Sequence, residues 1–419
     1  MPDAARKTLI VVENLPVPLD RRVWLEATSL TQAGYHVSVI SPMGRGWDAP
    51  YEEMQGVHIY RYPEPVEAHS SSIAYAREYL HALRHMFRLA RKVRREQGFD
   101  VIHGCNPPDL IFLLALRYRL AGVRYLFDHH DACPELFEAK FARRGLLYKV
   151  MLLWERWTFA VADVSLATNN SFRRIAIQRG GMAPEDVFVV RSAPKEDLFL
   201  PGDGDLRYRK GASYVIGYVG VIGQQEGMDL LVIAAQHLIE TLGKRDVHFV
   251  IIGFGPSLEE FVADVKAKGL GEYFTFTGAL FGEKMLEALN AVDIGVAPDP
   301  KNAMNDISTM NKIMEYMTLE KPVVQFDVTE GRFSAGDAGL YAQHNDPEDF
   351  ARQIAWLIDH PKDARHMGAL GRKRVLESLS WTHSVPSLLA AYDRIFKRND
   401  DRSSLIAPTQ RSAPTRPDG

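Results

Sequence analysis

Two glycine-rich stretches in the second half of the chain have residue types that can bind phosphate. Gly253-Phe254-Gly255-Pro256 follows the β-branched run His248–Ile252 and precedes a helical pattern. Glycines there let backbone amides approach a ligand, and the amino end of a helix favours negative charge. A tight strand-to-helix turn explains these residues equally well. The loop 217–227 has four glycines, Gly220 and Gly223 among them, and can wrap a diphosphate. The alternative explanation for this loop is a flexible connection between two elements.

The segment Ser308–Met317 combines a helix-capping residue with a charged pair. Ser308 can cap a helix, and Lys312 and Glu315 share a helix face because they lie three residues apart. A carboxylate there could accept two hydrogen bonds from ribose hydroxyls, while a lysine neutralises phosphate. On the residues alone, an ordinary exposed ion pair worth a few tenths of a kcal/mol is favoured.

His129 and His130 lie between Asp128 and Asp131, directly after the run Tyr125–Phe127. A histidine pair at a strand end is more often structural than catalytic, but the flanking carboxylates favour His130 as a site residue. His81 and His85 have a His-x3-His spacing without carboxylates nearby in the sequence, so no metal site is expected.

Buried β-branched runs alternate with helical patterns along the whole chain, which predicts parallel sheets covered on both faces. In the first half the predicted strands are Thr8–Val12, His36–Ile40, Val57–Tyr60, Val101–His103, Tyr125–Phe127, Val164–Ala167 and Val187–Val190. In the second half they are Val215–Val219, Phe249–Ile252, Phe274–Thr277, Ile294–Val296 and Val323–Phe326. The helical stretches include 22–33, 74–95 and 229–239.

The polar, glycine-rich segment 201–212 divides this pattern and predicts an interdomain linker. We therefore expect an α/β protein with a doubly wound, Rossmann-like domain at 1–200 and a second at 213–384. A helix at 385–398 and a disordered tail at 399–419 follow. The carboxyl ends of the strands in the two sheets predict a ligand in a cleft between the domains.

Composition excludes several classes of protein. With 419 residues, 46% hydrophobic residues and a formal net charge of −3, the chain gives no electrostatic reason to expect nucleic acid as a partner. Two cysteines, Cys105 and Cys133, cannot form a disulfide framework, which suits a reducing compartment. No signal peptide and no apolar run of about 18 residues is found, so a cytoplasmic location is expected.

The stretch 74–96 is basic and amphipathic. Its arginines and lysine surround a stripe that contains Leu80, Leu83, Phe87 and Ala90. Such a helix can lie on an anionic membrane surface, which would place the protein at the inner face of the plasma membrane. The alternative is a packed domain helix with a solvated basic face.

Taken in order, these motifs resemble the family 4 glycosyltransferases. In the second half the resemblance rests on Gly253-Phe254-Gly255, Phe276-Thr277-Gly278, Ala291–Pro298, the Glu315 helix, Pro322-Val323-Val324 and Ser380-Trp381. In the first half it rests on Asp20-Arg21-Arg22-Val23-Trp24, Ala33-Gly34-Tyr35 and Asp128–Asp131, which resemble a bacterial, polysaccharide-type branch. The resemblance implies a GT-B fold and transfer of a sugar with retention of anomeric configuration.

Site residues follow from the resemblance position by position. Glu315 matches the second glutamate of the family's Glu-x7-Glu motif, which holds the donor ribose. Ser308, Thr309, Met310 and Asn311 match the segment that meets the donor sugar and diphosphate, and Thr277, Gly278, Ala279 and Leu280 match the segment that reads the base. His130 matches the amino-domain histidine near the reacting centre, and we expect it to bond the donor sugar or orient the acceptor. Glu135 and Glu138 lie just beyond it in the sequence, and we expect them to touch the acceptor.

Three positions depart from the family pattern. Ile307 replaces the first glutamate, Val221 the usual arginine after the glycine loop, and Glu226 the usual lysine. In the family these two cations offset the charge of the diphosphate. We expect Lys312 to supply part of the missing positive charge, and Arg191, at the end of the last strand of the first domain, to supply more of it.

The resemblance implies a nucleotide-diphosphate sugar as co-substrate, no separate cofactor, and a saccharide or lipid-linked saccharide as acceptor. Two alternatives remain at this point: a nucleotide-sugar epimerase on the same fold, which would need no acceptor, and a non-catalytic paralogue. Val221, Glu226 and Ile307 favour the paralogue, whereas Lys312, Glu315 and His130 argue for an enzyme.

Overall fold

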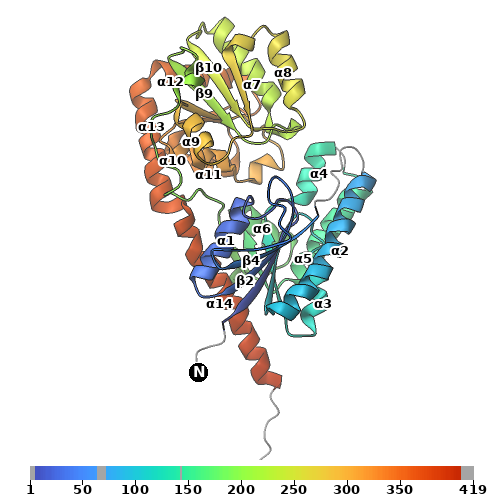
Figure 1. Cartoon of the computed structure of the whole chain (residues 1–419). Coiled ribbons are helices and arrows are strands. Elements are labelled where there is room, and N and C mark those ends of the chain that lie inside the picture. Colours follow the sequence, from blue (N-terminus) through green and yellow to red (C-terminus); the bar gives the residue numbers. More distant parts are fainter. Residues whose placement is uncertain (1–4, 64–71, 142–143, 407–419) are drawn as a thin grey trace, which may run out of the picture.

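The computed structural model describes residues 5–63, 72–141 and 144–406, which form two α/β units (Figure 1). In the first unit eight strands form one sheet in the order β3-β4-β2-β1-β5-β6-β7-β8. All its pairings are parallel except that of β3 with β4. The strands are β1 (Lys7–Val11), β2 (His36–Pro42), β3 (Tyr51–Met54), β4 (Val57–Tyr62), β5 (Val101–Cys105), β6 (Arg124–His129), β7 (Val164–Ala167) and β8 (Val187–Val189).

The second unit has a fully parallel sheet of six strands in the order β11-β10-β9-β12-β13-β14. Its strands are β9 (Tyr214–Val219), β10 (Val247–Ile252), β11 (Phe274–Gly278), β12 (Ile294–Ala297), β13 (Val323–Phe326) and β14 (Gly339–Ala342). The central strands of both sheets are buried on both faces, which is why they appear in the sequence as continuous apolar runs.

Helices cover both faces of each sheet. In the first unit α2 (Ser72–Glu96), α3 (Phe112–Arg119) and α5 (Leu146–Val161) pack on one face, and α1 (Arg21–Gln32) on the other. In the second unit α7 (Met228–Gln236), α8 (Leu258–Ala267) and α12 (Pro347–Asp359) pack on one face, and α9 (Gly282–Asn290) and α10 (Asn311–Thr318) on the other. The remaining α-helices are α4 (Cys133–Phe141), α6 (Asn170–Arg174), α11 (Thr329–Ala335), α13 (Pro361–Arg374) and α14 (Trp381–Ile406). No helix of the described residues is both long enough and apolar enough to cross a bilayer.

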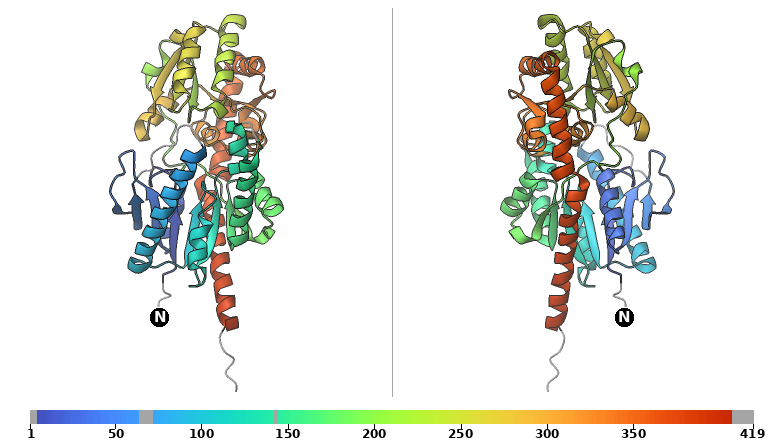
Figure 2. Two further views of the ribbon diagram at one scale, coloured as in Figure 1. Left: turned by 90° about the vertical axis from the view of Figure 1, so that its right-hand side faces the viewer. Right: turned by 90° about the vertical axis from the view of Figure 1, so that its left-hand side faces the viewer.

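The last helix, α14, returns to the first unit. Its residues Trp381, Leu388 and Tyr392 are buried in one core cluster with α1 and the first sheet. Figure 2 shows α13 and α14, in orange and red, running along the side of both units. The chain therefore crosses between the units twice, and the first unit is completed by the end of the chain.

The predicted limits of this last helix need correction. The structure begins α14 at Trp381 rather than 385 and continues it to Ile406 rather than 398. Proline is common in the first turn of a helix, where a start at 385 would place Pro386. Pro386 instead lies inside the helix, which begins at Trp381, and the indole of Trp381 donates a hydrogen bond to Ser29 Oγ. Residues 399–406, which were expected to be disordered, are thus helical, and 407–419 lie outside the described residues.

The alternation in the sequence predicts twelve of the fourteen strands of the described residues. It misses the antiparallel edge strand β3 and the parallel edge strand β14. β3 and β14 have four residues each. β3 is an edge strand whose residues alternate between exposed and half-buried, so it lacks the apolar run that marks the buried strands.

Candidate functional site

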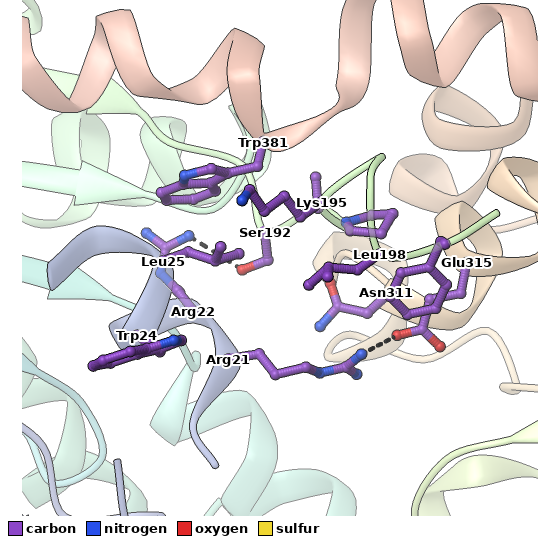
Figure 3. Close-up of a pocket in the computed structure, with 13 residues that line it drawn as sticks. Arg21, Arg22, Trp24, Leu25, Ser192, Lys195, Leu198, Asn311, Glu315 and Trp381 are labelled. Carbon is purple, nitrogen blue, oxygen red and sulfur yellow. Dashed lines mark hydrogen bonds and ion pairs between the residues drawn. The ribbon is translucent and has the colours of Figure 1, made fainter. Parts of the chain in front are cut away.

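A pocket of about 110 Å³ lies between the two units (Figure 3). Its walls come from the start of α1, the segment 192–199 that leaves the first unit, the start of α10, and Trp381. Arg21 and Arg22 approach from the first unit, and Asn311 and Glu315 from the second. The cleft predicted from the two sheets is therefore present, and the α10 part of the predicted site faces it.

Glu315 is buried and forms an ion pair across the units. Its Oε1 lies 2.7 Å from Nη1 of Arg21, whose side chain remains 59% exposed. Arg21 is the first residue of α1, and Glu315 lies in the second turn of α10. The carboxylate that the resemblance assigns to ribose thus faces the pocket and is already paired with a cation of the opposite unit.

The amino end of α10 is built differently from the prediction. Met310 is its N-cap residue and makes no side-chain cap, whereas Ser308 Oγ donates 2.7 Å back to the carbonyl of Met304. The expectation that Ser308 caps the helix is wrong, because a short 3-10 turn, Asn305–Ile307, uses this serine before the helix begins. Asn311 is the first helical residue and lines the pocket.

Thr309 joins the two units. Its Oγ1 accepts hydrogen bonds from Asn169 Nδ2 at 2.9 Å and from Arg191 Nη1 at 3.3 Å. Arg191 is also 3.5 Å from the buried carboxylate of Glu330. Arg191 therefore reaches the predicted segment, but a carboxylate already balances part of its charge.

Lys312 does not offer a free charge. Its Nζ lies 3.0 Å from both carboxylate oxygens of Asp299 and 3.3 Å from Glu226 Oε2, and it sits over the ring of Tyr218. Burial opposes the charge, but Asp299 and then Tyr218 and Glu226 hold the pKa of Lys312 well above its usual range. The expectation that Lys312 offsets a diphosphate is corrected, because two carboxylates already surround this buried ammonium.

Glu226 ends the glycine loop as part of this cluster. Burial raises its pKa to about 7, and Lys312 acts in the opposite direction. Asp299 and Glu226 together carry more negative charge than Lys312 balances once Glu226 ionises. A group that changes charge near neutral pH is therefore built into the floor of the glycine loop.

The glycine stretches come together at the carboxyl ends of their strands. Gly253 and Gly220 adopt φ angles of 155° and 153°, and a Cβ on Gly253 would lie 1.9 Å from the carbonyl oxygen of Gly220. A Cβ on Gly255 would likewise lie 2.3 Å from the carbonyl oxygen of Ile222. The packing of one loop on the other therefore requires glycine at 253 and 255. Gly223 begins the 3-10 turn Gln224–Glu226.

The predicted base-reading segment Thr277–Leu280 lies beside these loops. Gly278 accepts a hydrogen bond from the backbone of Gly253, and Thr277 Oγ1 donates 2.8 Å to the carbonyl of Gly278. Ala279 follows the strand, and Leu280 packs on the core under α9 and α10. The segment is thus joined to the glycine loops but does not line the pocket that holds Glu315.

His130 belongs to a buried network on the first unit. Its Nε2 contacts Asp128 Oδ2, and Arg22 Nε lies 3.0 Å from the same nitrogen. Arg22 Nη2 donates 2.6 Å to Asp128 Oδ1, so one carboxylate fixes both side chains. Burial opposes ionisation, but Arg22 and His130 hold the pKa of Asp128 well below its usual range. Arg22 also lines the pocket, so this arginine connects His130 to the pocket.

The same network has the residue types of a metal site. The potential ligand atoms of Glu26, Cys105, Asp128 and His130 lie within 4.8 Å of one another. The guanidinium of Arg22 lies among them, 3.1 Å from Glu26 Oε1. Burial and the nearby Asp128 raise the pKa of Glu26 well above its usual range, which favours a neutral Glu26. Arg22 thus supplies the positive charge that balances Asp128.

The two neighbouring histidines have different surroundings. His129 is fully buried among the rings of Phe127, Phe159 and Phe172, and burial lowers its pKa to about 3. His129 is therefore a neutral core residue, and His130 is the one that approaches the pocket network.

The acidic residues expected beside the acceptor are already in ion pairs. Glu135 is buried and binds Arg179, which also binds Glu155. Glu138 pairs with Arg144 at 2.6 Å. These contacts assign Glu135 to the packing of α4, so it does not present a free carboxylate.

Sequence reasoning missed Arg21 as a pocket residue and Asp299 as the partner of Lys312. Arg21 was named only as part of the motif Asp20-Arg21-Arg22-Val23-Trp24, which carries the family resemblance, and Glu315 lies 294 positions further along the chain. No local spacing could have joined them.

Solved structures with this architecture show which fold the chain has. Sucrose-phosphate synthase from Thermosynechococcus elongatus matches with a TM-score of 0.74 and 16% identity, over 94% of this chain and 100% of that one. Anabaena Alr3699/HepE in complex with UDP and glucose matches with a TM-score of 0.68 and 14% identity, over 93% of this chain and 99% of that one. The fold is that of the GT-B glycosyltransferases.

Family comparisons are more specific. The description "Glycosyl transferase 4-like domain" matches residues 19–193, and "Glycosyl transferases group 1" matches residues 213–360. A 2-deoxystreptamine glucosyltransferase from Streptomyces kanamyceticus is 25% identical over 319 residues, which are 73% of this chain and 80% of that protein. The chain belongs to the group 1, family 4-type glycosyltransferases.

Proposed function

We propose that this glycosyltransferase moves a sugar, with retention of anomeric configuration, from a nucleotide-diphosphate sugar to a saccharide acceptor. The observation that carries the proposal is the buried Glu315 at the pocket between the units, one turn from the amino end of α10. A carboxylate so placed can accept both ribose hydroxyls, and a helix amino end favours phosphate.

In this mechanism the first unit supplies His130. Arg22 and Asp128 orient its imidazole, so His130 can bond a hydroxyl of the donor sugar or of the acceptor. A front-face transfer, in which the leaving phosphate takes the acceptor proton, needs charge stabilisation rather than a side-chain nucleophile. No separate cofactor or metal is part of this proposal.

A thermal-shift panel of UDP, GDP, ADP and TDP tests the donor site. A nucleotide at about 100 times its dissociation constant adds roughly 2.7 kcal/mol to the free energy of unfolding. We expect one nucleotide to raise the melting temperature of the wild type and to lose most of this effect in Glu315→Gln. Glu320→Gln, on an exposed carboxylate after the same helix, is the control. A response that survives in Glu315→Gln contradicts the ribose assignment.

Product analysis separates transfer from epimerisation. Incubation of the bound sugar nucleotide without acceptor would change its sugar only if the protein were an epimerase. With an acceptor, the anomeric configuration of the product, measured by NMR, distinguishes retention from inversion. Nucleotide binding without turnover on any acceptor would support the non-catalytic alternative.

For the acceptor we propose a lipid-linked saccharide in the assembly of a bacterial surface or extracellular polysaccharide, on the cytoplasmic face of the membrane. The support is a surface of the first unit. On α2 the arginines at 84, 88, 91, 94 and 95 are exposed, whereas Phe87 and Ala90 pack on the core, so the packed-helix explanation holds for this part of the apolar stripe. Leu80 on α2, Leu116 on α3 and Trp157 on α5 are exposed. Figure 1 shows these three helices on the same side of the first unit. Basic and apolar side chains together suit an anionic bilayer.

Vesicle sedimentation tests this contact. The protein should bind vesicles that contain anionic lipid, bind neutral vesicles less, and lose binding in Leu116→Glu and Arg88→Glu. Leu376→Glu, on an exposed leucine of the second unit, should leave it unchanged. A soluble acceptor is the second candidate, favoured by the relative that is named for 2-deoxystreptamine. Equal binding to both kinds of vesicle, or none, supports that candidate.

A further inference from the structure

Both cations that were expected to offset a diphosphate are already paired. Lys312 is enclosed by Asp299 and Glu226, and Val221, within the glycine loop, carries no charge. Arg191 is buried and lies 3.5 Å from Glu330. A diphosphate bound at the amino end of α10 would therefore receive little compensation from the second unit.

The first unit places a more available cation at this end of α10. Arg21 projects from the first turn of α1 into the pocket, with its side chain 59% exposed and its guanidinium 2.7 Å from Glu315 Oε1 (Figure 3). Arg22, the next residue, also lines the pocket, but its guanidinium is buried and held by Asp128 and the carbonyl of Val190. Of this arginine pair only Arg21 can exchange its partner at little cost, since its charge is already solvated.

We propose that Arg21 is the diphosphate-binding cation of the donor site and that Glu315 holds it there until the donor arrives. The inference rests on the proposed function, because it requires a nucleotide whose ribose binds Glu315. When ribose hydroxyls take the oxygens of Glu315, the guanidinium is released beside the ribose. Ribose and diphosphate are separated by a single methylene group, so the released guanidinium needs only a side-chain rotation to form paired N–H···O bonds with phosphate.

The small size of the pocket agrees with this exchange. At about 110 Å³ it is smaller than the roughly 300–1,000 Å³ of ordinary ligand sites. Arg21 and Glu315 both line it and are paired at 2.7 Å, so ribose hydroxyls that bind this carboxylate have to displace Arg21 from it. Ligand binding and release of Arg21 are therefore one event, which makes the first unit a part of donor recognition.

The test compares a nucleoside with its diphosphate. Isothermal titration gives dissociation constants of UDP and uridine, or of the pair that the nucleotide panel selects, for wild type, Arg21→Ala and Arg21→Lys. Arg21→Ala should weaken diphosphate binding about 10- to 100-fold, the range of a charge-assisted contact. It should leave nucleoside binding unchanged or tighter, because Glu315 is then free. Arg21→Lys should recover part of the lost affinity.

Arg45→Ala is the matched control. Arg45 is a second exposed arginine of the first unit that reaches the second, but it lies over the ring of Phe254 rather than beside a carboxylate. It should not change the ratio of the two dissociation constants. The inference is overturned if Arg21→Ala weakens the binding of nucleoside and diphosphate by the same factor, or strengthens both. It is also overturned if only Arg45→Ala weakens diphosphate binding relative to nucleoside binding. Wild type that binds no nucleotide overturns the proposed function as well, which distinguishes the two failures.

Discussion

At the scale of single residues, His129 and His130 show how position on a strand decides chemistry. Successive side chains of a strand point to opposite faces. His129, the last residue of β6, turns into the aromatic core, whereas His130 follows the strand and meets Asp128 and Arg22. The same residue type thus serves packing at one position and the pocket network at the next.

The buried His129 predicts a loss of stability in acid. Its pKa is about 3 in the folded protein against an ordinary value of 6.5, so the unfolded chain takes up the proton first as the pH falls. The free energy of unfolding should then drop by up to about 1.4 kcal/mol per pH unit below about 6.5. In urea titrations between pH 7 and 5, His129→Phe should reduce this slope, and His366→Phe, on the exposed face of α13, should not. Equal slopes in wild type and His129→Phe would contradict this account.

At the scale of elements, α14 belongs to one unit in sequence and to the other in space. Tyr392 on this helix bonds Thr8 Oγ1 and His103 Nδ1, both at 3.0 Å, and His103 in turn lies 3.5 Å from Asp128. Tyr392 thus links α14 to β1 and β5, and His103 and Asp128 connect Tyr392 to His130. Together with α1, α14 covers the second face of the first sheet.

A cavity in α14 should therefore destabilise the first unit. Leu388 is fully buried against the first sheet, so Leu388→Ala should cost about 2–5 kcal/mol. Hydrogen exchange measured by mass spectrometry should rise in β1, β7 and β8 and stay unchanged in β9–β13. Leu376→Ala, at a leucine that is 40% exposed, is the control. Faster exchange confined to the second sheet would show that α14 belongs to the second unit.

At the scale of the whole molecule, polar contacts hold the units together around the pocket. Ser171 donates from both its backbone nitrogen and its Oγ to Glu330 Oε1, at 3.1 and 2.6 Å. Asn169 donates to the carbonyl of Ile307 and to Thr309. Polar interfaces of this kind can separate and re-form more readily than apolar ones, which suits a site that must admit a large substrate.

Glu330→Ala should favour a more open arrangement. Removing one partner of a buried charged contact costs roughly 3–5 kcal/mol, here at the interface and not in either core. Small-angle scattering should show a larger radius of gyration than wild type, while exchange protection inside each sheet is kept. Asp327→Ala removes a surface ion pair with Arg332 inside the second unit and should leave the scattering unchanged. An unchanged radius in Glu330→Ala would mean that this contact does not hold the units closed.

The sequence predicts those parts of the molecule that depend on neighbours along the chain. The β-branched runs at 8–12 and 164–167 predict their strands because a strand that is buried on both faces needs apolar residues at nearly every position. The glycines at 220 and 253 predict loops after their strands, but the close packing of one loop on the other, which requires Gly253, could not be predicted. The partners of Glu315 and Lys312 could not be predicted, because Arg21 and Glu226 reach them only through the packing of distant segments.

The return of α14 has a consequence for how the protein is made. The ribosome releases the first sheet long before residues 381–396 exist, so the part of one apolar face that α14 covers, including Leu126 on β6 and Leu166 on β7, stays uncovered until then. At about 5–20 residues per second, the remaining 190 or so residues take roughly 10–40 s to synthesise. The second unit, which is contiguous, can fold within that interval. The half that emerges first is thus finished last, and a chaperone has a defined surface and a defined time in which to protect the nascent chain.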